Sequence, residues 1–397
     1  MKNRLKNKIG TGTLFRILVI MFSVFMLTQN FPFCKSITEK AAVLSSKTVL
    51  VGAKVKNKDE TGEEKSHTET TENSKEPEKS ADNDSETQPA GEETTKSEPV
   101  QSNSLIDEDF TSEPDDIKKL TQEYSSKADK DKKDGAITEV TFTTAGVTDT
   151  YKNVRVKNVN DTKINIKNLL SQKADITVTD KSQPTVLIFH THTTEAYQIL
   201  DRSFYAQGYI TRSEDSAKNM IRVGDAICEQ LEKAGYKVLH DKTIYDKQYN
   251  GAYDRSREKV REYLKKYPSI QIVLDIHRDA IQYTDGTKVK PVSEIMGKKC
   301  AQIMIISGCQ ESGNGISGFD DWEYNLVFAL HLQKKLEDIF HGITRPLYFC
   351  PRKYVMNESH CNLLIEMGTD ANTLSEGVYS GKCLGTALAS LLDEYVT

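Results

Sequence analysis

Residues 184–195 read PTVLIFHTHTTE. The first half, up to Phe189, is a short apolar run of the kind that forms a buried strand. Two histidines and a glutamate follow at once: His190, His192 and Glu195. In parallel sheets covered by helices, functional side chains gather at the carboxyl ends of the strands. The stretch therefore predicts an α/β fold with a chemical site at the end of this strand.

Strands and helices alternate on the C-terminal side of this stretch. Further strands are predicted at residues 236–239, 270–276, 301–307 and 363–366, and helices at residues 257–266, 323–340 and 380–395. An earlier amphipathic helix is expected to follow a capping box of Thr211 and Glu214 and to end at Gly235. This alternation favours a mostly parallel sheet flanked by helices on both faces.

The first 34 residues are a candidate signal-anchor. Basic residues lie ahead of an apolar run at residues 17–27, which is the pattern of an export signal or a membrane anchor. No small-residue cleavage site follows the run directly, which favours an uncleaved single-pass anchor over a cleaved signal. The positive-inside tendency then places the remainder of the chain outside the cytoplasm.

Composition divides the rest of the chain into three parts. Residues 35–135 are rich in Glu, Lys, Thr, Ser and Asp, and we expect a disordered polar linker there. Residues 136–183 contain alternating apolar and polar positions and predict a small β-rich element. Residues 184–397 carry the α/β pattern and are the expected catalytic domain.

Charge and cysteine content exclude several classes of function. The net charge of −5 is too small to indicate a nucleic-acid partner. The seven cysteines include no CxxC pair, which excludes a zinc ribbon or a thioredoxin-type motif. We expect the cysteines to act as small buried apolar side chains.

Metal-ligating residue types occur at three predicted strand ends. His192 and Glu195 have the H-x-x-E spacing, which lets both side chains reach one ion from a single turn. His277, at the end of the strand at residues 270–276, is the expected third ligand. Two imidazoles and a carboxylate with an open fourth position form a common catalytic Zn²⁺ site. Glu366, at the end of another strand, is the expected general base for a metal-bound water.

Some roles at this site stay open. His190 is nearer the strand end than His192 and is the alternative ligand, in which case His192 would lie behind it. Asp275 lies two residues before His277 and is expected to orient an imidazole by accepting its ring N–H. Arg278 is expected either to hold a substrate carboxylate or to pair with Asp279.

Several of these motifs together resemble the stage II sporulation protein P family. The resemblance rests on residues 186–197 (VLIFHTHTTEAY), 222–225 (RVGD), 253–257 (YDRSR) and 275–280 (DIHRDA), in this order. It covers the chain from about residue 184 to the C-terminus, and the anchor and polar linker also fit the layout of that family.

The resemblance implies a peptidoglycan hydrolase of the engulfment machinery in endospore-forming bacteria. It implies kinship with zinc-dependent N-acetylmuramoyl-L-alanine amidases, with amidase and also endopeptidase activity. The implied partners are sporulation protein D, a lytic transglycosylase, and sporulation protein M, a membrane scaffold. The implied location is the space between the mother-cell and forespore membranes.

The resemblance to cell-wall amidases leaves the acidic ligand open. Those enzymes take their glutamate ligand from the start of the next helix, where this chain offers Glu214, whereas the H-x-x-E spacing favours Glu195. Glu366 matches the strand that carries the catalytic glutamate of the amidases. Two rival functions are a zinc carboxypeptidase or endopeptidase acting on wall peptides only, and a non-catalytic wall-binding activator module.

Overall fold

The computed structural model describes residues 105–310 and 316–397. The expected signal-anchor and the linker up to residue 104 lie outside the described residues. Within the described part of the chain, no helix combines the length and the hydropathy needed to cross a membrane.

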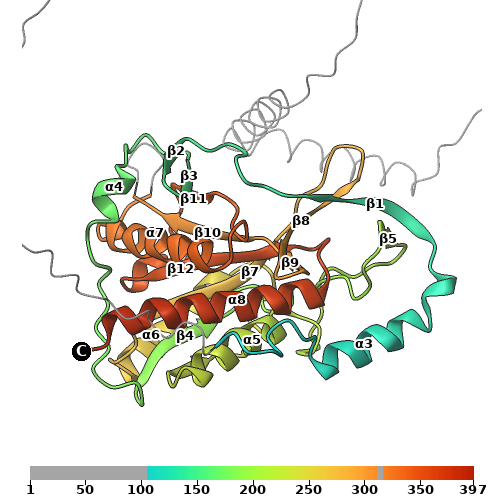
Figure 1. Cartoon of the computed structure of the whole chain (residues 1–397), viewed down its shortest axis with the longest axis horizontal. Coiled ribbons are helices and arrows are strands. Elements are labelled where there is room, and N and C mark those ends of the chain that lie inside the picture. The colour runs from blue at the N-terminus through green and yellow to red at the C-terminus, as the bar shows by residue number, and fades with distance from the viewer. Residues whose placement is uncertain (1–104, 311–315) are drawn as a thin grey trace, which may run out of the picture. The chain divides into compact units, whose positions relative to one another are not determined.

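The core is an eight-stranded sheet (Figure 1). Its strands are β2 (Asp149–Tyr151), β3 (Val154–Asn158), β4 (Pro184–Phe189), β6 (Lys237–His240), β7 (Ile272–Asp279), β10 (Ile303–Gly308), β11 (Leu347–Cys350) and β12 (Asn362–Thr369). Their order across the sheet is β2-β3-β11-β10-β12-β7-β4-β6. Five of the seven pairings are parallel and two are antiparallel, so the predicted mostly parallel sheet is confirmed.

Helices cover both faces of this sheet, as predicted. One face packs against α5 (Met220–Lys233), α7 (Trp322–Ile339) and α8 (Leu374–Leu392), and the opposite face packs against α6 (Ala252–Lys266). Strand alternation divides β4 between the two faces: Val186 and Ile188 join the larger core, while Leu187 and Phe189 join the core beneath α6. This parity decides where the side chains that follow β4 point.

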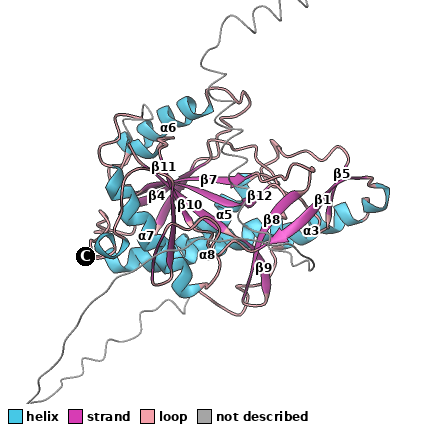
Figure 2. Ribbon diagram, turned by 90° about the horizontal axis from the view of Figure 1, so that it is seen from above, coloured by secondary structure: helices cyan, strands magenta, loops and turns pink. Residues whose placement is uncertain are grey.

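A second, four-stranded sheet lies beside the first (Figure 2). It contains β1 (Lys133–Val140), β5 (Phe204–Ala206), β8 (Lys288–Ile295) and β9 (Lys298–Ala301), in the order β5-β1-β8-β9. Residues 136–183 supply strands to both sheets, since β1 pairs with β8 and β3 pairs with β11. The same segment ends with the short helix α4 (Ile166–Leu169).

The linker predicted for residues 35–135 is wrong for residues 105–135, because this segment packs on the globular part of the chain. They include α3 (Asp115–Ser125), and Leu105, Phe110 and Ile117 are buried. The Phe110 ring stacks on Phe340 with ring centres 5.7 Å apart. Three apolar side chains in a polar background are enough to bind this segment to the core, although its average composition is that of a linker.

Three predicted helix starts are wrong. Helix α6 begins at Ala252, five residues ahead of the predicted residue 257. Thr211 and Glu214 form no capping box, because α5 begins at Met220 behind an Asn219 cap. The true capping box is Thr373 with Glu376, which starts α8 six residues ahead of the predicted Ser380. The prediction of Gly235 as the end of α5 is confirmed, since the Ala234 cap is followed by Gly235 at φ 84°.

Strands β5, β8, β9 and β11 were not predicted. The short β8–β9 connection contains Met296 and Gly297, both with positive φ. Only β9 is a short edge strand: it has 4 residues and pairs antiparallel with the 8-residue β8, which lies inside the sheet. A strand as short as β9 carries little alternating pattern in the sequence.

Candidate metal and catalytic site

A cavity of about 490 Å³ opens at the carboxyl ends of three adjacent parallel strands, β4, β7 and β12. The predicted residues His192, Glu195, His277 and Glu366 all line it. His277 and Glu366 sit opposite each other in the β7–β12 pairing. The cavity is also lined by other residues of β7, β12, α6 and the loops: Thr211, Arg212, Tyr249, Tyr253, Arg278, Asp279, Ala280, Tyr354, Leu364 and Asp370.

The structure separates the two first-strand histidines. His190 continues the β4 parity of Val186 and Ile188, so it points toward α5 on the other face of the sheet. It is fully buried, its Nδ1 lies 2.8 Å from the Ile276 carbonyl oxygen, and its Nε2 lies 2.9 Å from His240 Nε2. His192 lies in the turn beyond the strand and faces the cavity, with its ring centre 5.3 Å from that of His277.

His277 lies between two carboxylates. Its Nδ1 is 3.6 Å from Glu195 Oε2, and its Nε2 is 2.8 Å from Asp275 Oδ1. Burial on its own lowers the pKa of His277, but the charges and hydrogen bonds of Asp275 and Glu195 hold it well above its ordinary value. Asp275 is held in turn by the Thr191 backbone N–H (2.8 Å) and hydroxyl (2.7 Å), so it occupies the imidazole-orienting position that the sequence predicts.

Glu195 and Glu214 lie in different surroundings. Glu195 is buried at the cavity, where its Oε2 accepts from the Arg278 backbone N–H at 3.1 Å. Burial tends to raise its pKa, but the His277 hydrogen bond and the nearby positive charges bring the pKa down to about 2. The Glu214 side chain is exposed and pairs with Lys247 at 3.2 Å, outside the cavity. The structure therefore places Glu195, and not Glu214, next to the two histidines.

Glu366 differs from Glu195 in its protonation chemistry. It is surrounded by protein, and its Oε2 has no hydrogen-bond partner. Burial and the charge of Asp279 raise its pKa to about 8, with His277 acting in the opposite direction. A carboxyl group with a pKa near neutrality can both take up and release a proton under ordinary conditions.

Arg278 is hydrogen-bonded within the protein itself. Its guanidinium donates to the backbone carbonyls of Ala196 (2.7 Å), Thr211 (2.5 Å) and Asp279 (3.2 Å). These bonds tie the end of β7 to the loop after β4 and orient the guanidinium through three of its five N–H donors. The Asp279 carboxylate pairs instead with Arg345 at 2.9 Å.

Asp246 lies behind His192 and was not predicted from the sequence. The buried Asp246 carboxylate accepts from the Thr194 hydroxyl at 2.6 Å and from Arg212 at 2.5 Å, and it lies 4.0 Å from His192 Nδ1. Tyr249 stacks on the His192 ring with centres 4.8 Å apart. No spacing signal relates Asp246 to residues 192–195, because the contact depends on how the loop after β6 returns over the strand end.

The donor set of the cavity fits a zinc ion. Two imidazoles and Glu195 are the residue types of catalytic Zn²⁺ sites. Glu366 Oε2 is buried without a hydrogen-bond partner, and the water of a bound ion would satisfy this atom. Zinc ligands lie about 2 Å from the metal, so the side chains of His192, Glu195 and His277 would draw inward on binding.

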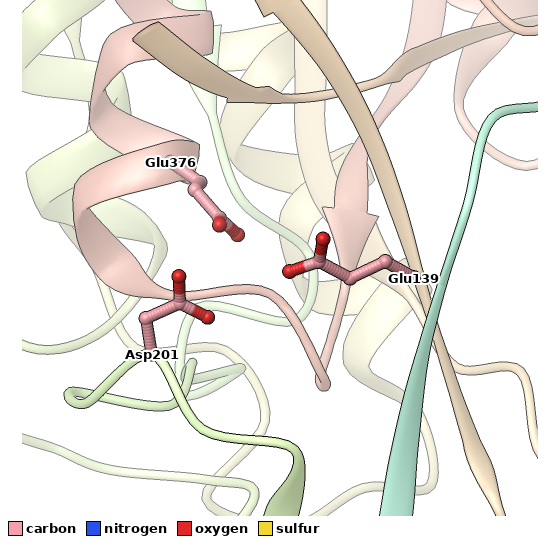
Figure 3. A group of neighbouring side chains, drawn as sticks. All are labelled: Glu139, Asp201 and Glu376. Atoms are coloured by element: carbon pink, nitrogen blue, oxygen red, sulfur yellow. The ribbon is translucent and has the colours of Figure 1, made fainter.

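The carboxylates of Glu139, Asp201 and Glu376 form a tighter acidic group, shown in Figure 3. They lie within 4.8 Å of one another and come from β1, the loop before β5 and α8. The buried Lys290 ammonium already pairs with all three, with its Nζ 2.6 Å from Asp201, 2.7 Å from Glu376 and 3.1 Å from Glu139, and Lys299 pairs with Asp201 and Glu139 as well. We therefore assign this group a structural role and place the candidate metal site in the cavity.

The fold and the cavity together define a class: an α/β protein with imidazole and carboxylate side chains gathered at the carboxyl edge of its sheet. The sequence pattern of the family described as stage II sporulation protein P matches residues 26–389. The chain belongs to this family, which confirms the resemblance found in the motifs.

A curated relative is stage II sporulation protein P of Bacillus subtilis (strain 168). It is 27% identical over 218 residues, which are 52% of this chain and 50% of the relative. The chain therefore matches this relative over about half of its length.

Several solved structures are similar in part. One is the CwlD amidase from Clostridioides difficile in complex with the GerS lipoprotein, with a TM-score of 0.33, 11% identity, and coverage of 53% of this chain and 98% of that chain. Another is the catalytic domain of CwlV, an N-acetylmuramoyl-L-alanine amidase from Bacillus (Paenibacillus) polymyxa var. colistinus, with a TM-score of 0.33, 13% identity, and coverage of 53% and 99%. TM-scores this low carry no argument about the chemistry of this chain.

Proposed function

We propose that this chain is a zinc-dependent peptidoglycan hydrolase that acts in sporulation engulfment. The proposed reaction is cleavage of the amide between N-acetylmuramic acid and the L-alanine of the stem peptide. The same site is proposed to have stem-peptide endopeptidase activity as well. The family membership supports the biological setting. The observation that carries the chemistry is that Glu366 is half-buried, lies opposite His277 in the β7–β12 pairing, and lines the same cavity as His192 and Glu195.

His192, Glu195 and His277 would hold the zinc ion. When bound, zinc would polarise a carbonyl and lower the pKa of its water to near neutrality. Asp275 holds the His277 ring by its Nε2, which leaves Nδ1 directed at Glu195 and the cavity. A carboxylate behind a ligating imidazole fixes the ring and raises its basicity.

Glu366 would move the proton. Its carboxylate takes a proton from the attacking water and later gives it to the leaving nitrogen of the amide. The pKa of about 8 lies close enough to neutrality for both transfers. A cation next to Glu366 would favour its carboxylate form, which is the form that accepts the first proton.

The proposed location and partners follow the family. We propose a single-pass membrane protein whose catalytic part lies outside the cytoplasm, in the space between mother-cell and forespore membranes. Its substrate would be peptidoglycan, and its partners sporulation proteins D and M.

The test is a digest of purified sacculi by the full chain and by the variant Glu366→Gln. Amidase action releases stem peptides that begin with L-alanine and leaves peptide-free glycan. We expect Glu366→Gln to bind as much zinc as the parent chain and to lose nearly all release, because the general base is gone. Chelation should abolish the parent activity, and added zinc should restore it.

Glu214→Gln is the matched control, since it changes an exposed carboxylate outside the cavity. It should keep both zinc and hydrolysis. Full hydrolysis by Glu366→Gln would refute the assigned base. Release of peptide fragments without free L-alanine amino ends would instead indicate a peptidase, and no zinc at neutral pH would favour a non-catalytic binding module.

A further inference from the structure

Tyr253 is a cavity residue that the proposed chemistry does not yet use. It lies in the first turn of α6, directly after the Gly251 cap, whose φ of 78° suits glycine. The turn is fixed to the strand end, because the Ser256 hydroxyl donates to the Thr191 hydroxyl at 2.8 Å, and the Thr191 hydroxyl donates in turn to Asp275. The backbone of Tyr253 is therefore held in a set position over the carboxyl end of β4.

The ring of Tyr253 is packed against both candidate imidazole ligands. It meets His192 edge-on with ring centres 5.4 Å apart, and it lies nearly parallel to His277 at 6.3 Å. Tyr354 packs on its far side at 5.3 Å. The ring is therefore held on several sides, and little entropy remains to be lost when its hydroxyl engages a ligand.

The Tyr253 hydroxyl is a donor without a protein acceptor. Among the hydrogen bonds of the described residues, none involves this hydroxyl, although the residue lines the cavity.

The other strong donors around the cavity are already engaged. Arg278 donates to three backbone carbonyls, and Arg212 pairs with Asp246 and Glu195. The Ala280 backbone N–H donates to the Asp279 carboxylate at 2.7 Å. Negative charge that develops on a carbonyl oxygen during amide cleavage would therefore find few free donors in this cavity.

We propose that Tyr253 is a catalytic residue whose hydroxyl donates a hydrogen bond to the carbonyl oxygen of the scissile amide as it gains negative charge. This inference rests on the proposed amide hydrolysis and adds a specific transition-state donor to it. A fixed donor directed at a developing oxyanion stabilises the transition state more than the ground state, so it raises kcat with little effect on KM.

The test compares the full chain with Tyr253→Phe, which removes the hydroxyl and keeps the ring. Loss of one oxyanion donor lowers kcat by about 100-fold or more, while KM and zinc content stay near the parent values. A second measurement uses a phosphinate analogue of the muramoyl-alanine amide, whose charged oxygens mimic the tetrahedral intermediate. The variant should bind this analogue at least 10-fold more weakly than the parent chain does.

Tyr263→Phe is the matched control, because Tyr263 lies on the same helix, stacks on Tyr267, and lies outside the cavity. It should leave kcat and analogue binding unchanged. The inference is overturned if Tyr253→Phe keeps kcat within about threefold of the parent, if it changes only KM, or if it loses zinc. A parent chain that releases no L-alanine amino ends from sacculi would overturn the proposed function instead, so the two failures are distinguishable.

Discussion

At the scale of single residues, the site depends on buried carboxylates that hold other side chains in place. Asp275 does this for His277, and Asp246 does it for the turn that carries His192 and Glu195. Asp246 has a fully buried side chain and accepts from the Thr194 backbone, the Thr194 hydroxyl and Arg212. A carboxylate in such a position is costly to bury unless these donors are present, so each partner depends on the others.

Asp246→Ala should therefore destabilise the fold and loosen the metal site. The lost hydrogen bonds, and the donors left unpaired, cost about 2–4 kcal/mol of unfolding free energy. Zinc affinity should also fall about 10-fold or more, as it does when groups behind metal ligands are removed. Urea unfolding and zinc titration measure the two effects.

Asp115→Ala is the control for that variant. The Asp115 side chain is 96% exposed and pairs only with Lys118, so its removal should change stability by less than about 0.5 kcal/mol. Equal stability of the Asp246 and Asp115 variants would contradict the role assigned to Asp246.

At the scale of elements, the α5–α8 pair carries much of the larger core. Gly377, Gly381 and Gly385 recur every four residues and share one face of α8. A Cβ at Gly385 would lie 2.6 Å from the Ile227 carbonyl oxygen, and one at Gly381 would lie 2.8 Å from the Val223 carbonyl oxygen. The small residues let the two helix backbones approach closely, and the four-residue repeat is visible in the sequence.

Gly385→Ala should lower the unfolding free energy by about 1–3 kcal/mol, because the backbone of α5 must move to admit the methyl group. Gly377→Ala should cost less, since its Cβ would meet the Tyr197 ring at 3.0 Å rather than backbone. Thermal unfolding of the two variants measures the difference. A Gly385→Ala protein as stable as the parent would show that α5 and α8 are less tightly packed than the 2.6 Å approach at Gly385 indicates.

At the scale of the whole molecule, two contacts tie outlying segments to the core. The segment before β1 is held by Phe110, which packs against Phe340 and Tyr379. Lys290 on β8 ties the four-stranded sheet to its neighbours. Its three carboxylate partners come from β1, the loop before β5 and α8: Glu139, Asp201 and Glu376. Neither contact is local in the sequence.

Phe110→Ala should cost about 3–5 kcal/mol of unfolding free energy, the usual loss for a buried phenylalanine. Tyr124→Ala on α3 is the control, since Tyr124 is 37% exposed and its loss should cost far less. Faster protease cleavage between residues 105 and 130 in the Phe110 variant alone would support the packing. Equal cleavage of both variants would argue that this segment is not held by Phe110.

Lys290→Met should give a pH-dependent loss of stability. Burial raises the pKa of Glu139 and Asp201, but hydrogen bonds from Lys290 and Lys299 outweigh it, so both pKa values lie below their ordinary ones. A depressed carboxyl pKa adds stability above the unfolded-state pKa and loses it as pH falls through the folded-state pKa. The variant should thus melt at a lower temperature than the parent at pH 7, and the gap should narrow below about pH 5.

The exposed Lys299 provides the control for the Lys290 experiment. Its side chain is 48% exposed and shares Glu139 and Asp201, so Lys299→Met should show a smaller gap of the same sign. Melting curves from about pH 2 to pH 8 measure both variants, because the folded-state pKa values of Glu139 and Asp201 lie below the ordinary carboxyl values. A gap for Lys290→Met that does not change with pH would contradict the charge pairing.

The sequence predicted the sheet, most helices and four residues that line the cavity: His192, Glu195, His277 and Glu366. The sequence shows the apolar runs of β4, β7 and β12 directly. It also shows the histidine, aspartate and glutamate side chains at their ends, because all of these are local features. Strand parity could not decide between His190 and His192, since both continue the parity of Val186 and Ile188. The turn after Phe189 is what directs His192 to the cavity. The capping box at Thr211 failed because the same residue types also occur in loops.

The sequence by itself determined the α/β class, the family, and which residue types meet at the strand ends, because these follow from local periodicity and spacing. Only the tertiary structure decided that Glu195 rather than Glu214 faces the histidines, that Arg278 is bound to backbone carbonyls, and that Asp246 and Tyr253 enter the cavity. It also decided that residues 105–135 pack on the core. These outcomes depend on contacts between residues far apart in the chain, whose geometry is set by how the loops return over the sheet.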